Sequence, residues 1–106
     1  MGLGRDSEDG RKNLPRPEEV VRELVNVAER IGIEVRVEPL DPEIFTRHRG
    51  GICKIEGART ILIDSTASTD EKMAVLLRAL GSVELDAVYM RPHLRQQIEQ
   101  HKKKTG

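Results

Sequence analysis

The chain has 106 residues, a length at which one domain can bury a single hydrophobic core without help from disulfides or metal ions. It contains one Phe, one Tyr and no Trp, which argues against single-strand nucleic-acid binding that stacks bases on aromatic rings. Lys and Arg number 18 and Asp and Glu number 18, so the net charge attracts the molecule neither to nucleic acid nor to an anionic membrane or acidic substrate.

Residues 1–14 are predicted to be a disordered N-terminal arm, because their glycines and alternating charges leave too few apolar side chains to offset the entropy of ordering. A single domain is predicted at residues 15–101. Its first helix begins at Pro17, since a proline followed by two glutamates suits the first helical turn. Apolar side chains recur at helical spacing up to Ile31, and Gly32 supplies a left-handed stop.

Residues 33–38 alternate between apolar and charged side chains, which predicts a strand with one face on the core. Asp41 is typical of a cap for one or two helical turns, in which Ile44 and Phe45 would pack inward. Residues 46–51 are predicted as a loop. The two adjacent glycines at its end are interpreted as turn residues rather than as a close approach to a ligand.

Two strands are predicted at residues 52–56 and 59–64, joined across residues 57–58 as a β-hairpin. The second of them is apolar on both faces, so it should be the more central strand. Residues 68–71 have the spacing of a capping box, and the apolar stripe over residues 70–80 predicts a mostly buried helix.

Residues 83–90 are interpreted as a turn and a short extended segment before a last helix that begins at Pro92. That helix is weakly amphipathic, with Leu94 and Ile98 on one face, so it should pack peripherally or wait for a partner. The basic residues 102–106 are predicted to form a flexible tail. Together these elements predict an α+β fold: two main helices and a peripheral C-terminal helix packed on a small, mostly antiparallel three-stranded sheet.

No catalytic residue, cofactor motif or metal site is predicted. Cys53 lies within a strand, where a free cysteine is typical of a small buried side chain with a slowly reacting thiol. Only His48 of the three histidines lies within a few residues of Cys53, and His93 and His101 form no second closely spaced pair, so the two ligand pairs typical of a structural zinc site are not found.

Four basic residues, Arg47, Arg49, Lys54 and Arg59, lie in or beside the predicted hairpin. They form a candidate basic patch for nucleic acid, whose binding would weaken steeply with salt. Because acidic residues are interspersed among them, a solvated face remains the alternative interpretation.

A candidate partner-binding surface lies near the end of the chain. Tyr and Met are over-represented at protein interfaces, and both occur just before the last helix. The residues predicted to bind a partner are Val88, Tyr89, Met90, Leu94 and Ile98. An unpaired edge strand could also add a second copy of the chain, so the sequence leaves a homodimer open.

Residues 28–35, followed by residues 59–64 and an apolar helix, resemble the front half of the ImmA/IrrE-type metallopeptidase domain, over residues 20–80. In that family a helix carries the zinc-binding motif H-E-x-x-H. Residues 75–80 stand at that helix here and contain neither His nor Glu, so no ligand is carried over. The resemblance implies a protease-like scaffold that acts by binding.

The segments 50–53 and 85–92 also resemble small bacterial proteins. The leading hypothesis is a small non-enzymatic bacterial adaptor or regulatory module that binds another protein. A single cysteine, no signal peptide and no long apolar stretch predict a cytoplasmic protein without membrane contact. Two alternatives remain: a nucleic-acid accessory protein that uses the basic hairpin and the lysine tail, and a small thiol- or metal-dependent hydrolase.

Overall fold

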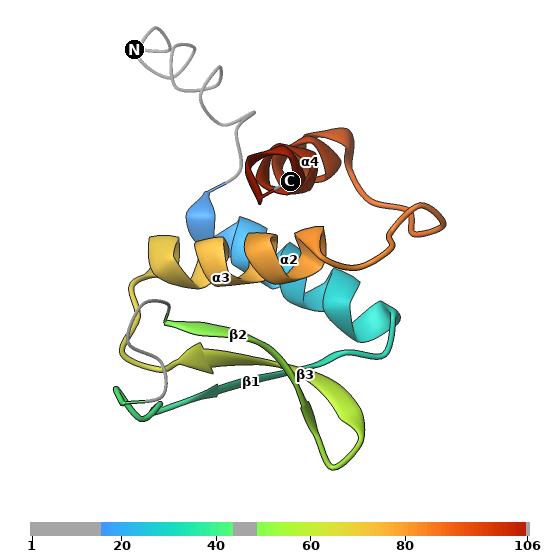
Figure 1. The fold of residues 1–106 in the computed structure, drawn as a ribbon. Coiled ribbons are helices and arrows are strands. Elements are labelled where there is room, and N and C mark those ends of the chain that lie inside the picture. Colours follow the sequence, from blue (N-terminus) through green and yellow to red (C-terminus); the bar gives the residue numbers. More distant parts are fainter. Residues whose placement is uncertain (1–15, 44–48, 106) are drawn as a thin grey trace, which may run out of the picture.

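The structure, a computed structural model, describes residues 16–43 and 49–105 and has three layers (Figure 1). A sheet forms one outer layer, α2 and α3 form the middle layer, and α4 lies across α3 on the other side. The predicted α+β fold is confirmed. The elements in chain order are α2 (Pro17–Arg30), β1 (Glu34–Glu38), β2 (Gly50–Ile55), β3 (Ala58–Asp64), α3 (Thr69–Gly81) and α4 (Pro92–Thr105).

The sheet is mixed, in the order β1-β3-β2. The hairpin strands β2 and β3 are antiparallel, whereas β1 runs parallel to β3. The prediction that β3 is central is therefore confirmed, and β1 and β2 are the two edges. Helices α2 and α3 cover one face of the sheet, and no described helix covers the other, which we call the open face (Figure 1).

Local sequence signals place α2 and α3 where they were predicted. Helix α2 has proline in its first turn, and Gly32 follows it with a φ of 83°, the left-handed stop. Helix α3 begins with the predicted capping box: Glu71 N–H donates to Ser68 Oγ (3.1 Å), and Ser68 N–H donates to Glu71 Oε1 (2.9 Å). Their apolar stripes meet in the core, which includes Leu24, Leu76 and Leu80.

The hairpin differs from the prediction at both ends. Its two-residue turn is Glu56-Gly57 rather than Gly57-Ala58, and positive φ values of 53° and 85° at these residues are typical of a type I′ turn. Strand β2 begins at Gly50, so the prediction of a loop through residue 51 is wrong for its last two residues. The reason is pairing, because Gly50 lies opposite Ile63 in the ladder.

Helix α4 was predicted to be peripheral, but its apolar side chains are part of the core. Leu94 is 2% exposed and Ile98 is 3% exposed, both against the layer that contains α3. The helix continues to Thr105, so residues 102–105 of the predicted tail are helical. Lysine is a good helix former, and positive charge is favourable at a helix C-terminus.

Two predictions concern residues outside the described part of the chain: the arm at residues 1–14 and the inward packing of Ile44 and Phe45. The predicted cap at Asp41 is present as a turn, in which Glu43 N–H donates to Asp41 Oδ1 (2.9 Å).

Candidate functional site

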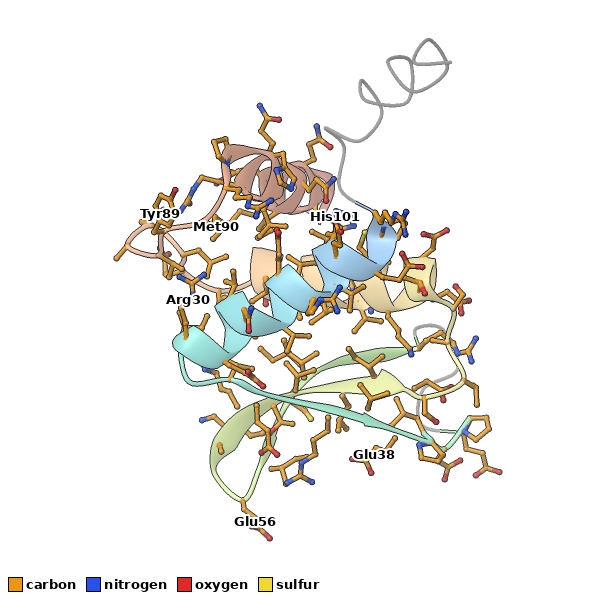
Figure 2. All side chains as sticks on the ribbon, turned by 180° about the vertical axis from the view of Figure 1, so that it is seen from behind. Arg30, Glu38, Glu56, Tyr89, Met90 and His101 are labelled. Atoms are coloured by element: carbon orange, nitrogen blue, oxygen red, sulfur yellow. The ribbon has the colours of Figure 1, made fainter. Side chains whose placement is uncertain are left out.

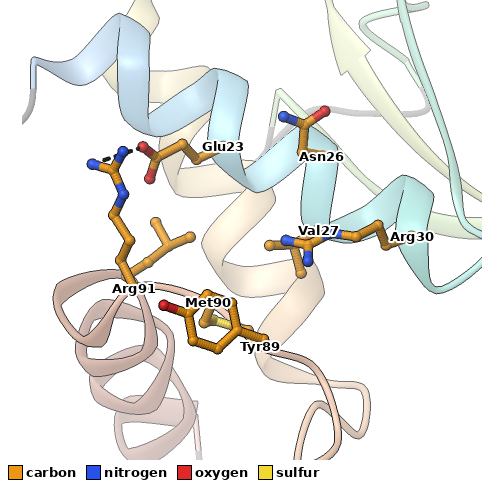
Figure 3. A pocket seen from close by; sticks show the side chains of 8 residues that line it. Glu23, Asn26, Val27, Arg30, Tyr89, Met90 and Arg91 are labelled. Atoms are coloured by element: carbon orange, nitrogen blue, oxygen red, sulfur yellow. Dashed lines mark ion pairs between the residues drawn. The ribbon is translucent and has the colours of Figure 1, made fainter.

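A pocket of about 280 Å³ opens between α2 and the segment that precedes α4 (Figure 3). The Tyr89 ring stands at its rim and is 81% exposed. Arg30 reaches across Val27 on the facing helix (Figure 3). We call this site the Tyr89 groove. Its lining residues are Glu23, Asn26, Val27 and Arg30 from α2 and Tyr89, Met90, Arg91 and Leu94 from the later segment.

An ion pair joins the two sides of the Tyr89 groove. Arg91 Nη1 lies 3.3 Å from Glu23 Oε2. The other carboxylate oxygen of Glu23 is buried and accepts no hydrogen bond from any described residue. Arg30 is exposed and forms no ion pair within the described part of the chain. The groove therefore offers an apolar floor and one available cation.

Three of the five residues predicted to bind a partner are core residues, and that part of the prediction is wrong. Leu94 and Ile98 are buried beneath α4, and Met90 is only 7% exposed. They are buried because α4 packs on α3 instead of waiting for a partner. Only Tyr89, and in part the half-buried Val88, remain accessible.

The predicted basic patch is divided by the fold. Lys54 and Arg59 lie directly opposite each other in the hairpin and are both exposed. Arg47 lies outside the described residues. Arg49 is engaged with acidic side chains, so it is not available as a patch cation. Its inclusion in the patch is wrong, because the ends of β3 and α3 bring acidic residues to it.

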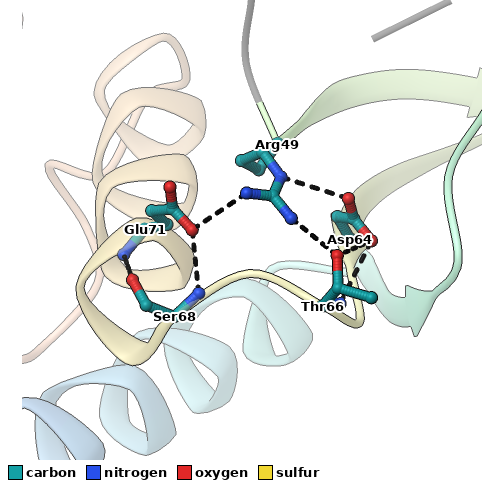
Figure 4. Close-up of polar contacts among 5 residues, drawn as sticks. All are labelled: Arg49, Asp64, Thr66, Ser68 and Glu71. Carbon is teal, nitrogen blue, oxygen red and sulfur yellow. Dashed lines mark hydrogen bonds and ion pairs between the residues drawn. The ribbon is translucent and has the colours of Figure 1, made fainter. Parts of the chain in front are cut away.

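The side chain of Arg49 forms a polar cluster that fastens the start of β2 to the end of β3 and the start of α3 (Figure 4). Its Nε donates to Asp64 Oδ2 (3.1 Å), its Nη1 to Glu71 Oε1 (3.2 Å) and its Nη2 to Thr66 Oγ1 (2.6 Å). We call these residues, with Ser68, the Arg49 cluster. Three of the Arg49 nitrogen atoms each donate to an acceptor in the cluster, so the cluster ties three segments of the fold together.

The Arg49 cluster also alters the acidity of Asp64. The pKa of Asp64 lies below its ordinary value, chiefly because the backbone N–H of Thr66 donates to its Oδ1 (3.1 Å). The Thr66 hydroxyl and Arg49 add to this effect, whereas partial desolvation opposes it. The folded protein therefore binds the Asp64 proton less tightly than the unfolded chain does.

This lowered pKa predicts a loss of stability in acid. The contribution of Asp64 is fully present above its unfolded pKa of about 3.9 and is lost as the pH falls through the lower folded pKa. We expect Asp64→Asn to lower Tm at pH 7, and the difference from wild type to shrink below about pH 4. Thermal unfolding followed by circular dichroism measures this. The exposed Asp86→Asn serves as control, and a gap that stays constant down to pH 2.5 would contradict the assignment.

Cys53 was predicted to be buried, but its side chain is only half-buried. It lies on the open face, where alternation places it with Leu62 and away from the helices. Among the described residues, no three His, Cys, Asp or Glu side chains are grouped so that they could hold a metal ion. In the same part of the chain, no helix combines the length and the hydropathy that a membrane span requires.

Comparisons with known proteins add no functional assignment to this geometry. No protein-family model, no curated protein and no solved structure gives a significant match to the chain.

Proposed function

We propose that this chain is a non-enzymatic module that binds another protein through the Tyr89 groove. The observation that carries the proposal is the Tyr89 ring, which is 81% exposed beside a pocket with an apolar floor. Tyr is enriched among the residues that dominate binding energy at protein interfaces. Within the described residues, Val37 is the only other large apolar side chain with comparable exposure.

The chemistry of the groove favours a partner side chain, because its floor is apolar and an exposed cation stands beside it. The exposed Arg30 favours an acidic neighbour in the partner. An apolar side chain flanked by an acidic residue would satisfy the floor and the cation together.

We also propose that the chain shares the scaffold of the metallopeptidase domain without its zinc motif. Its support is the order of helix, strand, hairpin and helix over residues 20–80. Helix α3 buries Val75, Leu76, Leu77, Ala79 and Leu80, so the position of the family's zinc motif is used for packing here. We also place the protein in the cytoplasm, which its single cysteine supports.

Tyr89→Ser is expected to weaken partner binding by about 30-fold or more, since truncating a central interface tyrosine costs about 2 kcal/mol. The ring is exposed, so the variant should keep the wild-type Tm. The measurement is a nuclease-treated pulldown at moderate salt, followed by titration of the captured protein against wild type and against Tyr89→Ser. Unchanged affinity in Tyr89→Ser would place the binding surface elsewhere.

A photo-crosslinking residue at position 89 tests the same contact directly. It should form a covalent adduct with the protein captured in the pulldown. The same residue at position 96 is the matched control, because Gln96 is exposed on α4 and does not line the groove. Equal crosslinking from the two positions would contradict the proposed site.

A further inference from the structure

The outer edge of β1 carries backbone groups that pair with no other described strand. Ser65 N–H donates to the carbonyl of Glu38 (3.0 Å), so the peptide groups of Glu38 face β3. Because these groups alternate along a strand, those of Glu34 and Arg36 also face β3, and those of Val35 and Val37 point away from the sheet. No described backbone group bonds to Val35 or Val37 at this edge. Such an edge is a template for another strand.

Charged and apolar side chains alternate along β1, and this pattern favours some partner strands over others. Glu34, Arg36 and Glu38 share the open face of the sheet, and Arg36 Nε donates to Glu34 Oε2 (3.1 Å). Val37 lies on the other face and is 52% exposed, because α2 packs near the beginning of β1 and does not cover its end (Figure 1). The end of β1 thus presents an apolar residue between a positive and a negative one.

We propose that two copies of this chain pair through β1, antiparallel and centred on Val37. In that register each Val37 exchanges two backbone hydrogen bonds with its counterpart, and each Val35 N–H donates to the carbonyl of Pro39 in the other copy. Arg36 of each copy then lies opposite Glu38 of the other on the open face. Proline has no N–H, so the ladder ends at Pro39.

Charge distinguishes this register from its neighbours. A shift that pairs Val35 with Val37 would place Arg36 opposite Arg36 and Glu34 opposite Glu38, and like charges directly opposite are unfavourable. A register centred on Val35 would place each exposed Val37 opposite the start of β1 in the other copy, near α2. The two Val37 side chains would then not meet at the centre of the pair. With 18 basic and 18 acidic residues, the chain has no net charge that would oppose self-association. The pairing edge also lies far from Tyr89 (Figure 2).

Sedimentation equilibrium over a concentration series measures the pairing in the full chain. We expect a reversible monomer–dimer equilibrium for wild type and a dissociation constant about ten- to hundredfold higher for Val37→Pro, which removes two hydrogen-bond donors from the pair. No described group of the monomer accepts from the Val37 N–H, and proline is tolerated on edge strands, so circular dichroism should show a folded variant. Wild type that stays monomeric up to its solubility limit would overturn the proposal.

Exposed charges provide a test that does not involve proline. Arg36→Glu alone and Glu38→Arg alone should each weaken the dimer, because each creates two like-charge pairs across the dyad. An equimolar mixture of the two variants should form a heterodimer, since every pair in it is then opposite in sign. A register centred on Val35 predicts no effect of Glu38→Arg. Failure of the mixture to associate would therefore overturn the assigned register.

Discussion

Gly50→Ala is expected to destabilise the protein by about 3 kcal/mol or more, through overpacking and backbone strain together. A Cβ atom at this position would lie 2.0 Å from the carbonyl oxygen of Leu62 and 3.0 Å from the Cα of Ile63. Both contacts are with backbone of the central strand, which cannot move aside as the end of a flexible side chain can. The φ of 153° at Gly50 is also one that residues with a side chain rarely adopt.

Gly51→Ala is the matched control, because a Cβ at Gly51 meets no atom within 4 Å. Urea unfolding of both variants, followed by circular dichroism, separates the two sites. We expect Gly51→Ala to lie within about 1 kcal/mol of wild type and Gly50→Ala to unfold at much lower urea. Equal midpoints would show that the close approach of β2 to β3 is not what requires glycine.

The elements that sequence predicted well are those set by neighbouring residues. These local signals each involve only a few consecutive residues. They are the proline and glutamates at the start of α2, the capping box of α3 and the alternation of apolar and charged residues in β1. The continuous apolar run of β3 identified the central strand, since a strand with a neighbour on each edge exposes less of its side chains than an edge strand does.

What sequence missed depends on residues far apart along the chain. Cys53 alternates with Ile52 as in any strand, and nothing local says which of them faces the helices. Arg49 looked like a free cation until Asp64 and Glu71 were placed beside it by β3 and α3. The role of Gly50 has the same origin, because only the pairing with β3 brings the Leu62 carbonyl against it.

The sequence singled out one side of the Tyr89 groove and not the other. The composition before α4 singled out Tyr89, because an aromatic residue beside a marginal helix is typical of an interface. The facing wall, with Glu23 and Arg30 on α2, carried no signal, since charged residues on the solvent side of an amphipathic helix are expected. A pocket between distant segments becomes visible only when their packing is known.

Leu94→Ala is expected to destabilise the protein by about 2 to 5 kcal/mol, the usual cost of removing a buried leucine side chain from a core. Leu94 is 2% exposed and belongs to the core cluster with Leu24 and Leu76. A domain of this size has a total stability of about 4 to 13 kcal/mol, so the variant should be close to unfolding. Urea denaturation and the dispersion of amide signals in an NMR spectrum measure both outcomes.

This result decides whether α4 is part of the fold or a helix held ready for a partner. Gln100→Ala is the control on the same helix: Gln100 is exposed, and alanine is at least as good a helix former, so stability should change by less than about 0.5 kcal/mol. If Leu94→Ala were equally mild, α4 would contribute little to the core, and its apolar face would again be available to a partner. A large cost, with the control unchanged, restricts the proposed binding surface to side chains such as Tyr89 that the packed helix leaves exposed.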